Sequence, residues 1–344
     1  MFLCRTISFF LMYDIMYSIS KFKPAWWLTN AHFQTLAAKF FRRKQKLVTI
    51  TETLELPDGD FIDLAWTEKP QKNNTRPIVV ILHGLEGSKD SHYAKGMLNA
   101  IKERGWVAVL MHFRGCSGKP NRQASSYHSG DIRDISYLTK QLISRYQQCA
   151  FSVLGFSLGG NVLTRYLAQV PNNPYRSAAV ICAPLDLASC SARINQGFSR
   201  LYQKYLLQML KDSTLEKIAT KIINNIKTTQ LDTINTIYDF DEQITAPLNG
   251  FTSAQHYYQQ ASGNPVMEKI KLPCLFIHAA DDPFLNHHLS IPQQKLPEHL
   301  TFEVSSHGGH VGFIHGNNPF KPQYWLEQRV PDFLNNHISI NSQK

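Results

Sequence analysis

The sequence predicts an α/β fold whose central sheet is mostly parallel, with an antiparallel hairpin at the N-terminal end, helices on both faces and an inserted helical cap. Three patterns in the 344 residues predict it: strand-like alternation around one turn, then short apolar segments separated by amphipathic stretches, and one long interval with helical spacing only. With 43% hydrophobic residues, the chain can bury one large core. We therefore expect one globular domain that carries an insertion.

The hairpin is predicted from residues 47–68, LVTITETLELPDGDFIDLAWTE, in which apolar and polar side chains alternate on both sides of a turn. Asp58 and Gly59 occupy this turn, and Asp-Gly favours the backbone angles of tight hairpins. Two antiparallel strands are therefore expected before the parallel part of the sheet.

The parallel strands are predicted from largely apolar segments, which are typical of strands buried on both faces. These segments are residues 77–84, 106–113, 151–157, 177–184, 273–279 and 300–306. Stretches with helical spacing lie between them at 92–104, 131–147 and 159–169. Strands and helices in alternation indicate a mostly parallel sheet with helices on both faces.

The insertion is predicted between the segments 177–184 and 273–279, where the pattern is helical and includes FSRLYQKYLLQMLK (198–211) and STLEKIATKIINNIK (213–227). A structureless loop of this length is rare in a compact domain. The predicted division is a loosely attached extension at 1–21, a first core part at 22–184, a helical cap at 185–265 and a second core part at 266–344.

Ser157 is the predicted nucleophile, because the residues GFSLG (155–159) match G-x-S-x-G. The pattern alone is common, but here a buried-strand pattern runs into it and a helical pattern runs out of it. In such a turn the glycines let the backbone bend sharply and lift the serine hydroxyl clear of the sheet. The alternative is a plain turn in which the serine caps the helix.

Two backbone N–H groups are predicted to bind the oxyanion. One belongs to Leu158, at the N-terminus of the predicted helix. The other is assigned to Leu85 in the loop HGLEGS (83–88), where a glycine lets an amide turn towards the site. His83 is expected to shape this loop through hydrogen bonds rather than to act as a base, because it leaves its strand on the sheet side of the oxyanion glycine.

His310 is the predicted general base. With nucleophile, acid and histidine in that chain order, the base belongs to the loop after the last strand, SSHGGHVGF (305–313). Glycines near His310 free the backbone to project it across the strand ends, whereas His307 is interpreted as an exposed loop residue. An H-x-x-H metal pair is not expected, because no carboxylate lies at useful spacing and the helical H-E-x-x-H pattern is absent.

The acid is expected after the preceding strand, in HAADDPFLN (278–286), which offers two adjacent carboxylates. Asp282 could cap a helix that begins at Pro283, which would leave Asp281 to orient the histidine. Against this, Pro283 restricts Asp282 to extended backbone and so fixes the direction of its carboxylate. A carboxylate has lone pairs for capping and orienting at once, so the two tasks are compatible. The restriction by Pro283 favours Asp282 as the acid, with Asp281 bound to loop backbone.

The composition limits the partners of the protein. Its net charge is +10, and the one dense basic cluster, KFFRRKQK (39–46), has phenylalanines beside cations, as a segment lying on a lipid surface would. A solvated basic face or a short connector explains the same cluster, so peripheral membrane contact is only one of the alternatives. No nucleic-acid partner is expected. The sequence does not determine the oligomeric state.

The N-terminal residues and the cysteines indicate the compartment. The apolar residues 1–20 are interrupted by Asp14, carry no A-x-A cleavage site and are too short an apolar run for a spanning helix, although a membrane anchor is the alternative. Six scattered cysteines without a C-x-x-C pair indicate neither a zinc site nor a disulfide framework. A cytoplasmic protein is therefore predicted.

Together these motifs resemble those of the α/β-hydrolases, and more narrowly the YheT-like esterase group, which is related to the animal α/β-hydrolase-domain lipases. The resemblance covers the chain from about residue 24 to its C-terminal helix. It rests on FKPAWWLTNAHFQTL (22–36), HGLEGS (83–88), HFRGCSGKPNR (112–122), YHSGD (127–131), GFSLGGN (155–161), FDEQITAPLNGF (240–251), HYYQQAS (256–262), AADDPF (279–284) and GGHVGF (308–313). It carries over Ser157, Asp282 and His310 as a catalytic triad.

The resemblance implies a serine hydrolase that cleaves short-chain or lipid-like carboxylic esters through an acyl-enzyme, without a cofactor or a metal. A thioesterase or amidase with the same triad is one alternative, and a non-catalytic lipid-binding or membrane-binding protein is the other. Aromatic residues of the cap either line an acyl pocket or simply pack the cap onto the core. They are Phe198, Tyr202, Tyr205, Phe251, Tyr257 and Tyr258. Arg114 either meets an acidic head group or forms an internal ion pair.

Overall fold

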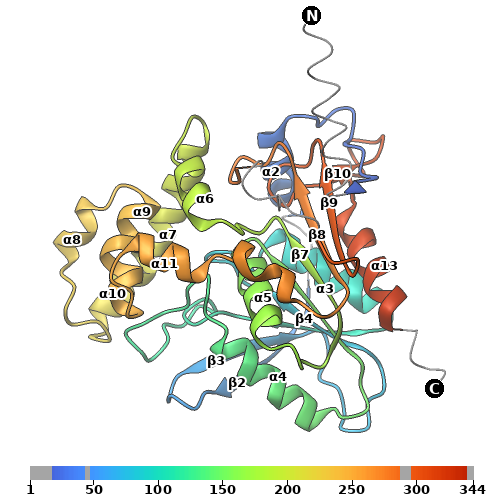
Figure 1. Ribbon diagram of the computed structural model, residues 1–344, viewed down its shortest axis with the longest axis horizontal. Helices are drawn as coiled ribbons and strands as arrows, with labels where there is room; N and C mark the ends of the chain where they lie inside the picture. Colours follow the sequence, from blue (N-terminus) through green and yellow to red (C-terminus); the bar gives the residue numbers. More distant parts are fainter. Residues whose placement is uncertain (1–17, 43–46, 287–295, 339–344) are drawn as a thin grey trace, which may run out of the picture.

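A single central sheet organises the protein (Figure 1). The structure, a computed structural model, describes residues 18–42, 47–286 and 296–338, and within them nine strands form this sheet in the order β1-β9-β8-β7-β6-β4-β5-β3-β2. The strands are β1 (Ser18–Ile19), β2 (Ile50–Glu55), β3 (Phe61–Trp66), β4 (Ile78–Leu82), β5 (Val107–Met111), β6 (Phe151–Phe156), β7 (Tyr175–Ile181), β8 (Cys274–Ala279) and β9 (Leu300–Ser305). Within this sheet, only the β2–β3 and β3–β5 pairs are antiparallel. The predicted fold class is confirmed.

The N-terminal hairpin is formed by β2 and β3, whose register pairs Glu55 with Phe61 next to the turn. The Leu56 N–H donates to the Asp60 carbonyl across 2.8 Å and closes the loop. Gly59 has a φ of 81°, a left-handed angle that glycine adopts without steric cost. The predicted Asp-Gly turn therefore lies where the alternation placed it.

Helices cover both faces of the sheet, and the central strands are therefore buried on both sides. In β4 the side chains of Ile78 and Val80 pack on one face with α4 (Arg133–Arg145) and α5 (Leu158–Gln169). Val79 points to the other face, where α3 (His92–Glu103) and α13 (Leu326–Ile338) pack. Each such side chain contributes roughly 1.5–3 kcal/mol by leaving water.

The segment between β7 and β8, which the structure describes throughout, contains helices and no strand. They are α6 (Leu187–Ile194), α7 (Ser199–Ala219), α8 (Thr228–Thr233), α9 (Ile237–Phe240), the π-helix η1 (Asp241–Thr245), α10 (Ala246–Leu248), α11 (Ala254–Ala261) and the 3₁₀-helix η2 (Asn264–Lys269). The first predicted helical stretch, 198–211, and the start of the second, 213–227, are joined in the single helix α7. Residues 220–227 are not helical, because the chain turns at Lys221 with a φ of 59°.

The helices α7 to α11 stand beside the sheet, at the left of Figure 1. The helices α7 to α10 share an apolar cluster that includes Leu207, Ile223, Leu231 and Phe240 and contains no strand residue, whereas α11 packs in a separate cluster with α6 and α10. A separate cluster of this kind supports the division into core and cap. We propose residues 185–265 as the cap.

The N-terminal segment is attached more closely than the sequence predicts. Residues 1–17 of the proposed extension and 43–46 of the basic cluster lie outside the described residues. Ser18 and Ile19, however, form β1 and pair in parallel with β9 at the edge of the sheet. The helix α2 (Ala31–Phe41) follows, with the Asn30 side chain capping its first turn. None of the helices in the described ranges has both the length and the apolar character needed to cross a bilayer.

Candidate active site

Ser157 lies at a sharp turn between β6 and α5. Its backbone has a φ of 50° and a ψ of −123°, which is strained for a residue with a Cβ. Its N–H donates to the Ile181 carbonyl across 2.8 Å, and this bond holds the turn against β7. A Cβ on Gly159 would lie 2.3 Å from the His83 carbonyl oxygen, so only glycine fits there. The local sequence therefore forces the serine out of the sheet.

His310 reaches Ser157 from the loop after β9. The Nε2 atom of His310 lies 3.0 Å from the Ser157 Oγ, and its Nδ1 lies 2.8 Å from Oδ2 of Asp282. Because a carboxylate accepts, Nδ1 carries the proton and Nε2 accepts from the serine hydroxyl. The Phe284 ring stacks on the imidazole at a centroid distance of 4.1 Å and fixes its plane. The structure thus brings the three predicted residues into one hydrogen-bonded chain.

The two neighbouring aspartates have separate partners. Asp282 is buried and uses both oxygens: Oδ1 accepts the Phe284 N–H at 2.8 Å, while Oδ2 faces His310. No helix begins at Pro283, since residues 283–286 form turns and bends, so Oδ1 holds a loop N–H while Oδ2 orients the histidine. Asp281 accepts the Gly309 N–H at 2.9 Å, and burial raises the pKa of its carboxyl. Asp281 thus holds the backbone of the histidine loop.

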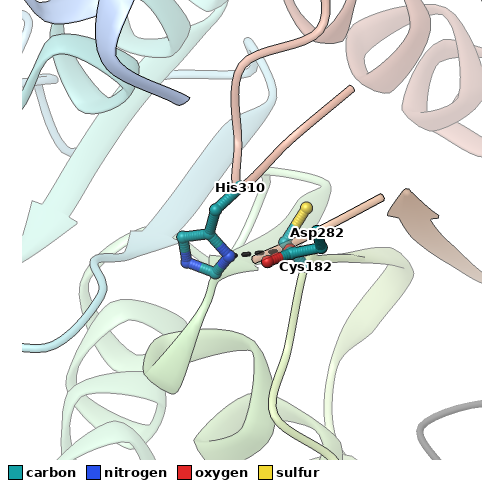
Figure 2. A group of neighbouring side chains, drawn as sticks. All are labelled: Cys182, Asp282 and His310. Atoms are coloured by element: carbon teal, nitrogen blue, oxygen red, sulfur yellow. Dashed lines mark hydrogen bonds and ion pairs between the residues drawn. The ribbon is translucent and has the colours of Figure 1, made fainter. Parts of the chain in front are cut away.

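The buried thiol of Cys182 lies beside Asp282 and His310 (Figure 2). Cys182, Asp282 and His310 each offer one ligand atom, and these atoms lie within 4.8 Å of one another, as a metal site would require. Burial, followed by the charge of Asp282, raises the pKa of the Cys182 thiol well above its usual value, so the sulfur stays protonated. The Nδ1 atom of His310 is already engaged with Asp282. These properties disfavour a metal ion here.

The predicted oxyanion loop is held from two sides. The Gly84 N–H donates to the Tyr93 hydroxyl at 2.9 Å, and the Glu86 N–H donates to the Tyr127 hydroxyl at 2.8 Å. Between them, the Leu85 N–H has no hydrogen-bond acceptor among the described residues. A Cβ on Gly84 would lie 3.2 Å from the Ser157 Cβ, so the loop is in contact with the nucleophile turn.

The same loop is connected to the cap. The carboxylate of Glu86 accepts hydrogen bonds from the hydroxyls of Tyr127 at 2.9 Å and of Ser213, in α7, at 2.7 Å. Burial raises the pKa of Glu86. Nothing in the sequence points to Ser213, because the pairing depends on how α7 crosses the core.

His83 shapes the oxyanion loop, as the sequence predicts, through both ring nitrogens. The Phe113 N–H donates to its Nε2 at 3.0 Å, so the ring proton is on Nδ1, which donates to the Gly84 carbonyl at 2.7 Å. Burial lowers the pKa of His83 to about 3. A neutral ring with both nitrogens engaged is not available as a general base.

The helix α2 positions the histidine loop, which sequence reasoning missed. The Thr35 hydroxyl accepts the His310 N–H at 2.9 Å. Gln34 is fully buried; its amide donates to the carbonyls of Leu28 at 2.7 Å and Ile314 at 2.9 Å, and its Oε1 accepts the Ile314 N–H at 2.7 Å. The only signal in the sequence is that NAHFQT lies within a motif of the family.

Replacing Gln34 with leucine is expected to lower the free energy of unfolding by about 2–4 kcal/mol, because a buried N–H and two carbonyls lose their partner. Urea unfolding of the two proteins measures the difference. Gln208→Leu on α7, where the amide is exposed and contacts only Asp212, is the matched control and should change stability by less than about 0.5 kcal/mol. We call the hydrogen bonds of Gln34 and Thr35 to the histidine loop and the residues after it the Gln34 and Thr35 clamp. Equal stability of Gln34→Leu and the parent would contradict a stabilising role of Gln34 in this clamp.

The site opens into a cavity of about 890 Å³ between core and cap. Ser157, Leu158, Leu85 and His310 are all in its wall. Of the six aromatic residues considered from the sequence, Phe198, Tyr202, Tyr205, Tyr257 and Tyr258 line it, whereas Phe251 does not. Asp241, in η1, is a further wall residue; burial raises the pKa of its carboxyl to about 6.

Arg114 does not line this cavity. Its guanidinium is buried and forms two hydrogen bonds with Asp134, at 2.8 and 2.6 Å, and one with Asp58, at 2.6 Å. Arg114 thus joins the hairpin turn to α4 through an internal ion pair, which is the second of the two interpretations of this residue.

A mostly parallel sheet with a serine turn between β6 and α5, and a histidine loop after β9, defines an α/β hydrolase. The family described as alpha/beta hydrolase fold matches residues 77–317, and the chain belongs to this family. It is 42% identical over 330 residues to the Escherichia coli (strain K12) protein named "Putative esterase YheT", with 94% of this chain and 96% of that protein covered. The predicted family is therefore confirmed.

Two further similarities extend this result. Phospholipase ABHD3 of Bos taurus is 26% identical over 308 residues, which cover 88% of this chain and 75% of that protein. The crystal structure of the Pyrococcus furiosus esterase Pf2001 has a TM-score of 0.51 at 15% identity, covering 94% of this chain and 98% of that chain, and shows the shared fold. The relatives are thus hydrolases of the esterase and lipase type.

Proposed function

We propose that the protein is a serine hydrolase of carboxylic esters, with Ser157 as nucleophile, His310 as general base and Asp282 as the acid that orients it. The observation that carries this proposal is the hydrogen-bonded chain from Asp282 through His310 to Ser157, with heavy-atom distances of 2.8 and 3.0 Å, at the wall of a large cavity. These distances suit proton transfer between serine and imidazole.

The proposed reaction has two halves. His310 takes the proton of the Ser157 hydroxyl as the oxygen attacks the ester carbonyl carbon, and the negative charge on the carbonyl oxygen is bound by the N–H groups of Leu85 and Leu158. The imidazolium, stabilised by Asp282, then gives its proton to the departing alcohol, which leaves an acyl-enzyme. Water, deprotonated by His310, attacks the acyl carbon and releases the acid and the free serine.

The proposed substrate is a short-chain or lipid-like acyl ester. The cavity lies within the range of volumes that bind small molecules, and the cap lines it with aliphatic side chains. These include Leu187, Ile194, Leu206, Met209, Ile237, Ile244 and Leu248. Such a wall suits an acyl chain, and the names of YheT and ABHD3 point to ester bonds.

A panel of p-nitrophenyl esters from acetyl to dodecanoyl, run beside acyl-coenzyme A thioesters, tests this proposal. We expect ester hydrolysis, with kcat/KM rising with acyl length until the chain fills the apolar part of the cavity. Faster cleavage of the thioesters would make the protein a thioesterase. Absence of hydrolysis across the panel would favour a non-catalytic lipid-binding role.

A further inference from the structure

Two helices beside the catalytic cavity expose large apolar side chains. On α2, Phe33 and Phe40 are 64% and 72% exposed. On α7 and at its N-cap, Phe198, Leu201 and Tyr205 are 52%, 57% and 54% exposed. Single exposed apolar residues are ordinary on a protein surface, but a group of five is not.

The spacing places each set on one side of its helix. Phe33 and Phe40 are seven residues apart, which is close to two helical turns. Phe198, Leu201 and Tyr205 follow the i, i+3, i+7 pattern. Each helix therefore presents an apolar stripe to solvent.

The two helices are in contact with each other. The Nδ1 atom of His32 lies 3.2 Å from the Tyr202 hydroxyl, and the His32 ring lies 4.4 Å from that of Phe198. About two turns further along each helix from the His32–Phe198 contact, the Lys39 ammonium donates to the Tyr205 hydroxyl at 3.4 Å. We call the five exposed residues Phe33, Phe40, Phe198, Leu201 and Tyr205 the α2–α7 face.

This face borders the entrance of the cavity. Phe198, Leu201 and Tyr205 are both exposed and part of the cavity wall, and Leu36 and Lys39 of α2 belong to the same wall. A molecule that enters from this side therefore passes directly from the apolar face to the apolar interior.

The charged side chains that α2 and the first half of α7 expose are positive. Lys39, Arg200 and Lys204 are exposed on the two helices. The helix α2 contains no acidic residue, and α7 contains none before Asp212. Aromatic and leucine side chains mixed with cations match the interface of an anionic bilayer, where apolar groups insert and cations meet phosphate.

We propose that the α2–α7 face docks the protein on an anionic lipid surface and receives its substrate from that surface. Delivery of an ester to Ser157 rests on the proposed function, whereas docking does not require catalysis. The proposed membrane contact therefore joins Lys39 and Phe40, the first residues of the basic cluster, to residues of α7, a helix far away in the sequence.

Co-sedimentation with vesicles tests docking in the Ser157→Ala protein, which leaves the lipid intact. The probes are vesicles of equal parts phosphatidylglycerol and phosphatidylcholine, and vesicles of phosphatidylcholine alone. We expect at least about tenfold tighter binding to the anionic vesicles at low salt, with the difference reduced in high salt by screening. Hydrolysis of a water-soluble ester by the parent protein is measured separately, so a failure of docking is distinguishable from a failure of catalysis.

Two pairs of substitutions outside the cavity wall test the face itself. Phe33→Ser with Phe40→Ser should weaken binding to both kinds of vesicle by more than about tenfold, because apolar insertion is lost. Arg200→Gln with Lys204→Gln should weaken binding to the anionic vesicles by about tenfold or more and leave the weak binding to neutral vesicles unchanged. Neither pair should alter hydrolysis of the water-soluble ester.

The controls are exposed residues on other elements. Ile50→Ser changes an apolar side chain, 47% exposed, on β2, which lies at the bottom of Figure 1, whereas α2 lies at the top. Lys102→Gln with Lys140→Gln removes two exposed cations from α3 and α4. Both control proteins should bind as the parent does.

The proposal is overturned if the parent does not bind the anionic vesicles or if the face variants bind them as tightly as the parent. It is also overturned if the control variants lose as much vesicle binding as the face variants. Size-exclusion chromatography without lipid tests whether the α2–α7 face instead binds a second copy of this protein. A dimer that the Phe33→Ser with Phe40→Ser protein cannot form, together with unchanged vesicle binding, would make the face a contact between two copies and would also overturn the proposal.

Discussion

Replacing Ser157 with alanine is expected to lower the turnover of an ester substrate by about 10⁶-fold, because no acyl-enzyme can form and only the oxyanion amides and substrate binding remain. The hydroxyl is the only group on the Asp282–His310 chain that can attack a carbonyl. Initial rates with p-nitrophenyl butyrate measure the loss, and a fluorophosphonate probe reports whether the serine is activated.

A second serine serves as the control for this measurement. The Oγ of Ser306 lies 2.9 Å from Nδ1 of His307, in the same loop as His310, but this pair is at the surface, and no aspartate of the described residues is hydrogen-bonded to His307. Ser306→Ala should react with the probe and turn over substrate as the parent does. Labelling that survives Ser157→Ala, or disappears with Ser306→Ala, would show that the nucleophile has been assigned to the wrong residue.

Replacing Asp282 with asparagine is expected to lower turnover by about 10⁴-fold, as loss of the orienting carboxylate does in serine proteases. An amide NH₂ facing Nδ1 favours the tautomer with the proton on Nε2, and this atom then cannot accept the Ser157 proton. The fold should persist, because the asparagine oxygen can still cap the Phe284 N–H that Oδ1 of Asp282 accepts at 2.8 Å. Initial rates and urea unfolding measured on one preparation separate the two effects.

The neighbouring residue is the matched control. Asp281→Asn keeps an oxygen for the Gly309 N–H and replaces the second, buried oxygen with an amide NH₂ group. A loss of turnover far smaller than that of Asp282→Asn is expected, with stability near that of the parent. If Asp281→Asn were the more damaging of the two, Asp281 and not Asp282 would be the acid of the site.

The strands and the serine turn could be predicted because their signals are local. Segments such as 77–84 are apolar at every position because both faces of the strand are covered, and this requires no knowledge of which helices cover them. Gly155 and Gly159 are required by the turn that they flank. The extent of α7 was harder to predict, since Asp212 and Ser213 interrupt the apolar pattern without ending the helix.

The sequence favours Asp282 over Asp281 as the acid but does not decide between them. Both residues follow β8, and both can accept hydrogen bonds from a loop. Their partners, Gly309 and His310, are adjacent residues on another loop. Which carboxylate meets the imidazole depends on how the two loops face each other, and only the tertiary structure specifies this.

The sequence by itself determined the α/β architecture, the family and the three residues proposed for the chemistry. Only the tertiary structure revealed the Gln34 and Thr35 clamp on the histidine loop, the link from Glu86 to Ser213, and the α2–α7 face at the cavity entrance. The physical reason is the range of the interactions. Apolar periodicity and glycine turns express backbone preferences of neighbouring residues, whereas a hydrogen bond between Thr35 and His310 joins positions 275 residues apart and exists only once the whole chain has packed.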